Sequence, residues 1–147
     1  MKMENNKLDP NWITGFVDAE GCFSITLCKD IRQKVKWRIQ PKFRIKLHSR
    51  DEDLLKDIRL YFNCGNIYRS KSKESKEYKK ITFMVCDMNS INNVLIPHFD
   101  KYPLITQKLK DYLLWKNIVE LMNKKEHLNF RGLRKIVALM GSLNKGL

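Results

Sequence analysis

The most informative segment of this chain is Trp12-Ile13-Thr14-Gly15-Phe16-Val17-Asp18-Ala19-Glu20-Gly21. Asp9 and Pro10 precede it and predict a helix start, with Asp9 as N-cap and Pro10 at the first helical position, and Gly21 predicts the helix end. Asp18 and Glu20 therefore lie at the C-terminal end of a helix, where the helix dipole disfavours negative charge. A functional role explains them better than helix stability, and solvated surface acids are the alternative.

This helix also offers a surface for self-association. Gly15 and Ala19 are four residues apart, so they share one smooth face that another helix can approach closely. The candidate dimer interface comprises Trp12, Gly15, Phe16 and Ala19. A two-fold pairing there would bring two copies of Glu20 together, and the two carboxylates would repel unless divalent cations lay between them. Glu20, the Gly21 carbonyl, waters and the oxygens of a bound ligand would suit Mg²⁺, which keeps several waters, and we expect Mn²⁺ to substitute.

Two-residue alternation follows the helix. Phe23, Ile25 and Leu27 predict the buried face of a first strand, and a polar turn at 30–33 leads into a longer alternating run from Lys34 to His48. At ~3.3 Å per residue this run would extend about 50 Å, more than one turn of duplex DNA. Six of the eight polar-side residues of the run are Lys or Arg and none is acidic, whereas an ordinary solvated strand usually mixes both signs.

The polar side of the predicted sheet gives the candidate DNA contacts. The groove-facing candidates are Ser24, Thr26, Cys28, Arg38, Gln40, Arg44, Tyr68, Ser70, Lys80, Thr82 and Met84. The phosphate-contact candidates are Lys34, Lys36, Lys42, Lys46, Lys71 and Lys73.

The remaining pattern predicts one α+β domain over residues 1–147, with residues 1–7 flexible. A capping box at 49–52 opens a helix that runs to about Phe62, and a second hairpin follows with strands at 66–70 and 80–86. A short helix over 88–96 is expected to end at Pro97. Two longer helices are expected over 106–123 and 130–143, with Leu113 and Val137 on their inner faces. The order predicts an antiparallel sheet with helices on one face.

Composition limits the classes of partner. The chain has 147 residues, with 29 Lys and Arg against 16 Asp and Glu, so its net charge of +13 favours a polyanion. No apolar run is long enough to cross a bilayer. The four cysteines form no C-x-x-C pair, and the first residues resemble neither a secretory signal nor a transit peptide, so we expect the protein to work in the compartment where it is made.

The segment from Ile13 to Gly21 resembles the LAGLIDADG motif of homing endonucleases and intron maturases. The similarity continues over nearly the whole chain, in residues 43–51, 102–108, 125–128 and 142–147. The resemblance implies an αββαββα core, a four-stranded DNA-binding saddle with helices on the other face, and Mg²⁺-dependent cleavage of both DNA strands with staggered ends. It implies that Glu20 is the metal-binding acid and that Lys108 is the basic residue near the metal-bound water, with a phosphate contact as the alternative for Lys108. Asp18 belongs to the same catalytic group, with orientation of the helix end as its expected role.

One motif is present, so the resemblance implies a homodimer that reads a long, near-palindromic DNA site. A half of a two-motif protein is the alternative. An intron RNA-splicing maturase, with intron RNA as a partner, and a non-cleaving DNA-binding regulator are the alternative functions on the same fold. The resemblance further implies an intron-encoded protein that is made and used in a mitochondrion or chloroplast.

Overall fold

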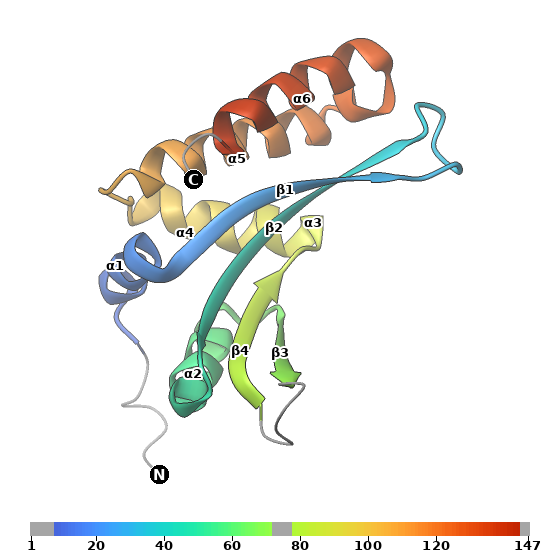
Figure 1. The fold of residues 1–147 in the computed structure, drawn as a ribbon. Helices are drawn as coiled ribbons and strands as arrows, with labels where there is room; N and C mark the ends of the chain where they lie inside the picture. The colour runs from blue at the N-terminus through green and yellow to red at the C-terminus, as the bar shows by residue number, and fades with distance from the viewer. Residues whose placement is uncertain (1–7, 72–77, 145–147) are drawn as a thin grey trace. The chain divides into compact units, whose positions relative to one another are not determined.

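The computed structural model describes residues 8–71 and 78–144 (Figure 1). The N-terminal segment that we predicted to be flexible and the phosphate-contact candidate Lys73 lie outside the described residues. In chain order the elements are α1 (Pro10–Glu20), β1 (Gly21–Lys29), β2 (Trp37–His48), η2 (Ser49–Asp51), α2 (Glu52–Phe62), β3 (Asn66–Lys71), β4 (Tyr78–Val85), α3 (Met88–Ser90), η3 (Ile91–Leu95), α4 (Ile96–Lys101), α5 (Lys108–Asn123), η4 (Glu126–Leu128) and α6 (Phe130–Asn144). The strands form one sheet in the order β1-β2-β4-β3. The predicted α+β class and four-stranded antiparallel sheet are confirmed.

The chain divides into two compact units. Unit 1 comprises Met1–Cys22 and Phe43–Thr106, and unit 2 comprises Phe23–Lys42 and Gln107–Leu147. Strand β2 contributes its first half to unit 2 and its second half to unit 1. The prediction of a single domain over 1–147 stays a prediction.

Unit 1 begins with the predicted N-cap. The Asp9 carboxylate accepts hydrogen bonds from the backbone N–H groups of Asn11 and Trp12 at 2.8 and 3.3 Å, and α1 ends where Gly21 turns extended. The core of this unit is a cluster of buried rings from β2, α2, β4 and α4. These rings are Phe43, Phe62, Phe83 and Phe99, with centroids 5.8–6.4 Å apart. Helix α2 packs against β3 and β4, which closes the apolar side of the hairpin.

Two local predictions in unit 1 are wrong. The capping box at 49–52 does not form, because the side chain of His48 accepts the backbone N–H of Arg50 at 3.1 Å and starts a 3-10 turn, η2, before α2. The Glu52 carboxylate instead pairs with Arg69 of β3, with both contacts at 3.0 Å. The Glu52 side chain is therefore engaged by a residue 17 positions away in the chain.

Pro97 does not end a helix, contrary to the prediction. The chain continues from α3 through the π-helical turn η3 into α4, and Pro97 occupies the first turn of α4. The backbone N–H of Ile96 bonds to the carbonyl of Ile91, five residues back. A proline ring collides with the carbonyl four residues before it in an ordinary helix, and the wider turn avoids that contact.

Unit 2 holds β1 against α5. Phe23 lies 5.3 and 5.1 Å, ring centroid to centroid, from Tyr112 and Trp115, and all three side chains are buried. The Trp115 indole N–H also donates to the backbone carbonyl of Ser24 at 3.0 Å, on a strand at the edge of the sheet. This bond satisfies an edge carbonyl that would otherwise be open to pairing.

Helix α5 packs on α6, and α6 packs on η4. The expected inner faces of these helices are partly wrong, because Leu113 and Val137 are 52% and 43% exposed. Tyr112 and Trp115 fill the core in place of Leu113 in the first half of α5, and Ile118, Val119 and Met122 complete the buried stripe. None of the described helices is both long and apolar enough to cross a membrane.

Candidate active site and nucleic-acid interface

The two acids at the end of α1 have different surroundings. Asp18 is half-buried, and its carboxylate accepts the backbone N–H groups of Ile105 and Thr106 at 3.1 Å each and the Thr106 hydroxyl at 2.8 Å. Glu20 is exposed, and no hydrogen bond or ion pair to its carboxylate is present in residues 8–71 and 78–144. Asp18 is thus occupied in holding the helix end to the 105–106 segment, while Glu20 can take an external ligand.

Gly21, which follows Glu20, lies too close to Val17 to carry a side chain. A Cβ built on Gly21 would lie 2.6 Å from Val17 Cγ1 and 3.0 Å from the Val17 carbonyl oxygen. The Gly21 N–H donates to that same carbonyl, which closes the last turn of α1. Only glycine lets β1 leave the helix at this angle with the Glu20 side chain outside.

A buried hydrogen-bonded chain fixes α1 from its inner side. His98 contacts the Tyr61 hydroxyl through Nδ1 at 3.0 Å and the Thr14 hydroxyl through Nε2 at 3.1 Å. Thr14 donates in turn to the backbone carbonyl of Tyr102 at 2.8 Å. One neutral tautomer satisfies every member: Tyr61 donates to Nδ1 and the Nε2–H donates to Thr14. Burial lowers the pKa of His98 to about 4, which keeps the ring neutral.

The candidate interface residues lie on the outer side of α1. Gly15 and Ala19 are exposed, and a Cβ built on Gly15 would meet nothing within 4 Å. Trp12 is 43% exposed and stacks on Phe16, with ring centroids 5.1 Å apart and planes 11° apart. This face of the helix is therefore open to a partner.

One chain offers few side chains that could bind a metal ion at the end of α1. In the part of the chain that the structure describes, no group of three or more His, Cys, Asp or Glu residues could hold a metal. Asp18 already accepts several hydrogen bonds, so Glu20 and the backbone carbonyl of Gly21 are the protein ligands that this end of α1 could offer. One carboxylate per chain fits Mg²⁺, which takes one or two carboxylates and retains waters.

Lys108 is the first residue of α5 and is half-buried. It follows Thr106, the residue that Asp18 holds, by two positions in the chain. Its predicted role near a metal-bound water stays a prediction.

In unit 1, the strand register places the predicted groove-facing residues in three rows. Arg44 pairs with Met84, Lys46 with Thr82, and His48 with Lys80. The rows continue into β3, where Met84 pairs with Asn66, Thr82 with Tyr68, and Lys80 with Ser70. The intervening residues Ile45, Phe83 and Ile81 are fully buried, so the two faces alternate as predicted. Asn66 shares the first row and was missed, because the sequence pattern placed it at a strand end.

In unit 2, the polar side carries the remaining strand candidates. Cys28 and Arg38 are exposed, and Ser24, Thr26, Gln40 and Lys42 are half-buried. The Thr26 hydroxyl donates to the Gln40 carbonyl at 3.3 Å, which ties β1 to β2. Pro41 lies on the buried side and two residues before Phe43, where pairing of β2 with β4 begins, so its missing N–H does not interrupt that ladder. Lys71 ends β3, and its side chain lies outside the described residues.

The predicted start of the long strand is wrong. Strand β2 begins at Trp37 and has 12 residues, or roughly 40 Å, so Lys34 and Lys36 belong to the β1–β2 loop and not to a strand face. Val35 is 2% exposed and anchors the loop, and Lys36 takes a left-handed conformation with φ 67°. Both lysines are exposed, so the revised position still leaves them accessible to phosphates.

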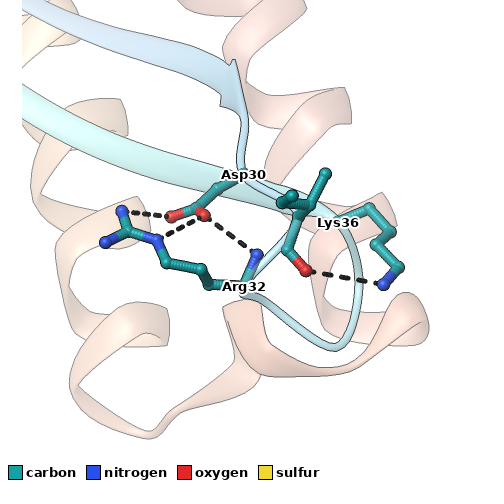
Figure 2. A network of polar contacts seen from close by, with 4 residues as sticks. Asp30, Arg32 and Lys36 are labelled. Carbon is teal, nitrogen blue, oxygen red and sulfur yellow. Dashed lines mark hydrogen bonds and ion pairs between the residues drawn. The ribbon is translucent and has the colours of Figure 1, made fainter.

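The same loop holds a polar network that sequence reasoning missed. Figure 2 shows the Asp30 carboxylate facing Arg32, with Nε–Oδ1 at 3.0 Å and Nη2–Oδ2 at 3.2 Å. The backbone N–H of Arg32 also donates to Oδ1 at 3.1 Å. These bonds from the Arg32 side chain and backbone lower the pKa of Asp30. An acid and an arginine two residues apart were the only sequence signal, and alone they are common in turns.

Comparisons with known proteins agree with this architecture. Residues 13–119 match the family model described as LAGLIDADG endonuclease. The chain is 43% identical over 141 residues to a Neurospora crassa protein described as "Probable intron-encoded endonuclease 2", and the match covers 95% of this chain and 30% of that protein. It is 28% identical to "Homing endonuclease I-ApeII" of Aeropyrum pernix, covering 79% of this chain and 65% of that protein.

Two solved structures are similar over 96% of this chain. I-SmaMI bound to an uncleaved DNA target in the presence of calcium ions has a TM-score of 0.88 and 39% identity, and this chain covers 46% of it. The homing endonuclease I-TnaI has a TM-score of 0.87 and 30% identity, and this chain covers 91% of it. This chain therefore spans about a third to a half of some relatives and nearly all of another. Because the family model matches most of its residues and the fold agrees over nearly its full length, the chain belongs to the LAGLIDADG endonuclease family.

Proposed function

We propose that this chain is a site-specific endonuclease that hydrolyses both strands of a long, near-palindromic DNA site with Mg²⁺ and leaves staggered ends. The observation that supports the proposal most directly is the different surroundings of the two acids at the end of α1. Asp18 is hydrogen-bonded to the 105–106 segment, whereas Glu20 is exposed and its carboxylate has no partner among the described residues. Family membership and the acid-free polar rows of the sheet support it.

The chain's own residues would divide the chemistry as follows. Glu20 and the Gly21 carbonyl would hold Mg²⁺, or Mn²⁺ in its place, and the bound ion would activate a water and stabilise the leaving oxygen. Asp18 positions the helix end through its bonds to Ile105 and Thr106. Lys108 would lie beside the reacting water as a basic group. The polar rows would fix the DNA through base edges and phosphates.

Because each chain offers one metal-binding carboxylate, a site with two carboxylates requires two copies of the chain. Two-fold pairing of α1 through Trp12, Gly15, Phe16 and Ala19 would bring two copies of Glu20 to one composite site. The likeness to I-TnaI, 91% of which this chain covers, supports the homodimer, whereas the 46% coverage of I-SmaMI is what half of a two-motif protein would give. We favour the homodimer.

The genetic context follows from relatives. The Neurospora crassa protein is described as intron-encoded, and a 42% identical Podospora anserina protein is described as lying in ND4 intron 1. We infer that this chain is intron-encoded as well, and that it acts in an organelle.

The decisive test removes the charge of one acid. Glu20→Gln should abolish cleavage of plasmids that carry a library of randomised inserts, while DNA binding in Ca²⁺ stays within a few-fold of the wild type. Glu120→Gln, the same change at an exposed acid of α5, is the matched control and should cut normally. Cleavage by the Glu20 variant, or cleavage by the wild type without a divalent cation, would contradict the mechanism.

A further inference from the structure

The β1–β2 loop presents one arginine in a fixed orientation. The Arg32 side chain is 82% exposed, whereas the side chain of Asp30, its ion-pair partner, is only 8% exposed. Two side-chain bonds and one backbone bond join the residues (Figure 2). An exposed arginine ordinarily samples many rotamers, and this bidentate contact favours one of them before any ligand arrives.

The loop that carries the pair is itself closed. The backbone N–H of Asp30 bonds to the carbonyl of Lys36 at 2.9 Å, and the N–H groups of Gln33 and Lys36 bond to the carbonyls of Asp30 and Gln33 at 3.0 Å each. The Lys36 ammonium reaches the Ile31 carbonyl at 3.5 Å, and Val35 is buried beneath. Arg32 therefore projects from a turn that backbone hydrogen bonds close.

Asp30 also lies close to the polar side of the sheet. The charge of Arg38, a groove-facing candidate on β2, is among the causes that lower the Asp30 pKa, after the hydrogen bonds and charge of Arg32. Arg38 belongs to the same compact unit as the loop. The pair lies where β1 ends at Lys29, and the backbone bond from Asp30 to Lys36 joins it to the residue before β2.

Guanidinium chemistry defines what the pair can bind. Arginine carries five N–H groups, and the Asp30 carboxylate uses one on Nε and one on Nη2. The edge formed by Nη1 and Nη2 still has two parallel donors. That fork matches two acceptors side by side, as in the O6 and N7 atoms of guanine or two oxygens of a phosphate.

The net charge of the Asp30–Arg32 pair favours a DNA base edge over a phosphate as its ligand. Asp30 neutralises Arg32, so the pair as a whole offers little net attraction to a phosphate, and its carboxylate repels one. Lys34, in the same loop, forms no ion pair among the described residues and is the better phosphate ligand. A neutral but rigid donor fork contributes selectivity more than affinity.

We infer that Arg32, held by Asp30, is a specificity-determining residue that reads a guanine edge in the major groove of the DNA target. The inference rests on the proposed function, because it requires a sequence-specific DNA complex. Arg32 supplies the bidentate contact, and Asp30 is the positioning residue that fixes its direction.

The test measures sequence preference and salt dependence together. The 147-residue wild-type chain and its variants select from a library of randomised DNA duplexes in Ca²⁺. Dissociation constants of the selected duplex and of its single-base variants are then measured at several salt concentrations. Arg32→Ala should weaken binding to the selected duplex roughly 10- to 100-fold and remove the preference for guanine at one position of each half-site. Its slope of log affinity against log salt should match the wild type.

Two further variants separate reading from charge. Arg32→Lys keeps the charge but loses the fork, so it should lose the same base preference. Asp30→Ala frees the arginine, so it should lower the preference while raising affinity for unrelated DNA and steepening the salt slope. Lys34→Ala is the contrasting control: it should weaken all duplexes equally and reduce the slope by about 0.9, the loss of one phosphate contact. Thermal unfolding of each variant confirms that the fold is retained.

The outcomes are distinct. If Arg32→Ala behaves like Lys34→Ala, or leaves every base preference unchanged, the assignment of Arg32 is overturned while the endonuclease proposal stands. If the wild type selects no sequence at all, the proposed function fails instead.

Discussion

At the residue scale, the two acids of α1 show how similar side chains acquire different roles. Asp18 and Glu20 are two positions apart, but Asp18 faces Ile105 and Thr106, and Glu20 faces outward. The sequence predicted a special role for both and assigned orientation of the helix end to Asp18. Its partners could not be named in advance, because Thr106 is 88 residues away in the chain.

His98 gives a residue-scale prediction about pH. Its pKa is lowered by burial from the ordinary 6.5 to about 4. Between pH 6.5 and about 4, the His98 ring is protonated in the unfolded chain but neutral in the folded chain. The free energy of unfolding therefore decreases as the pH falls through this window. At about 1.4 kcal/mol per pKa unit, the free energy of unfolding should fall by roughly 3 kcal/mol in total. Urea unfolding at a series of pH values between 6.5 and 4 measures this loss.

The control for this prediction is His98→Gln, which removes the titrating ring. The variant should have lower stability at pH 7, because the Thr14 and Tyr61 hydroxyls lose their partner, and a flatter dependence on pH than the wild type. Burial also lowers the pKa of His127, which acts in the same direction in both proteins. Equal slopes for wild type and variant would show that His98 does not titrate as stated.

At the element scale, the helical regions show where local patterns succeed and fail. Asp9, Pro10 and Gly21 bounded α1 correctly, because caps and breakers act on adjacent residues. The same logic failed at Pro97, where the π-helical turn η3 lets the helix continue into α4. It also failed at 49–52, where His48 supplies the cap. At Pro97 a wider backbone turn overrides the local signal, and at 49–52 the side chain of His48 does so.

Two glycines of α6 allow a matched test of element packing. A Cβ on Gly132 would collide with the Glu126 carbonyl of η4, whereas a Cβ on Gly141 would meet nothing within 4 Å. Gly132→Ala should therefore lower the free energy of unfolding by about 1–3 kcal/mol, because η4 must move away from α6. Gly141→Ala should raise it by up to ~1 kcal/mol through better helix propensity. Chemical denaturation of both variants checks the difference, and equal effects would contradict the close approach of η4.

At the scale of the whole molecule, the open face of α1 predicts the assembly. By light scattering, the free wild type should have twice the 17.5 kDa mass of one chain, and its DNA complex should have the mass of two chains plus one duplex. Gly15→Leu adds a side chain where the single chain has open space, so the monomer should fold normally while the helix pairing is blocked. Its mass should fall to that of one chain, and cleavage should be lost.

The control for Gly15 is Gly141→Leu, a substitution at another position with open space, on α6. It should keep the wild-type mass and activity. A wild type that cuts both strands as a single chain, or a Gly15 variant that remains dimeric, would refute the interface on α1.

The sequence by itself determined the helix caps, the alternating faces of the strands, the basic polar surface and the family motif. These features depend on nearest neighbours and on the two-residue and 3.6-residue periods, so they are present in the order of residues. The tertiary structure decided which groups meet: His98 with Thr14, 84 positions apart, Asp18 with Thr106, and Trp115 with the backbone of Ser24. It also showed which turn conformation places Asp30 against Arg32, since a two-residue spacing allows the pair but does not require it. Contacts between positions far apart in the chain depend on long-range packing, which no local pattern specifies.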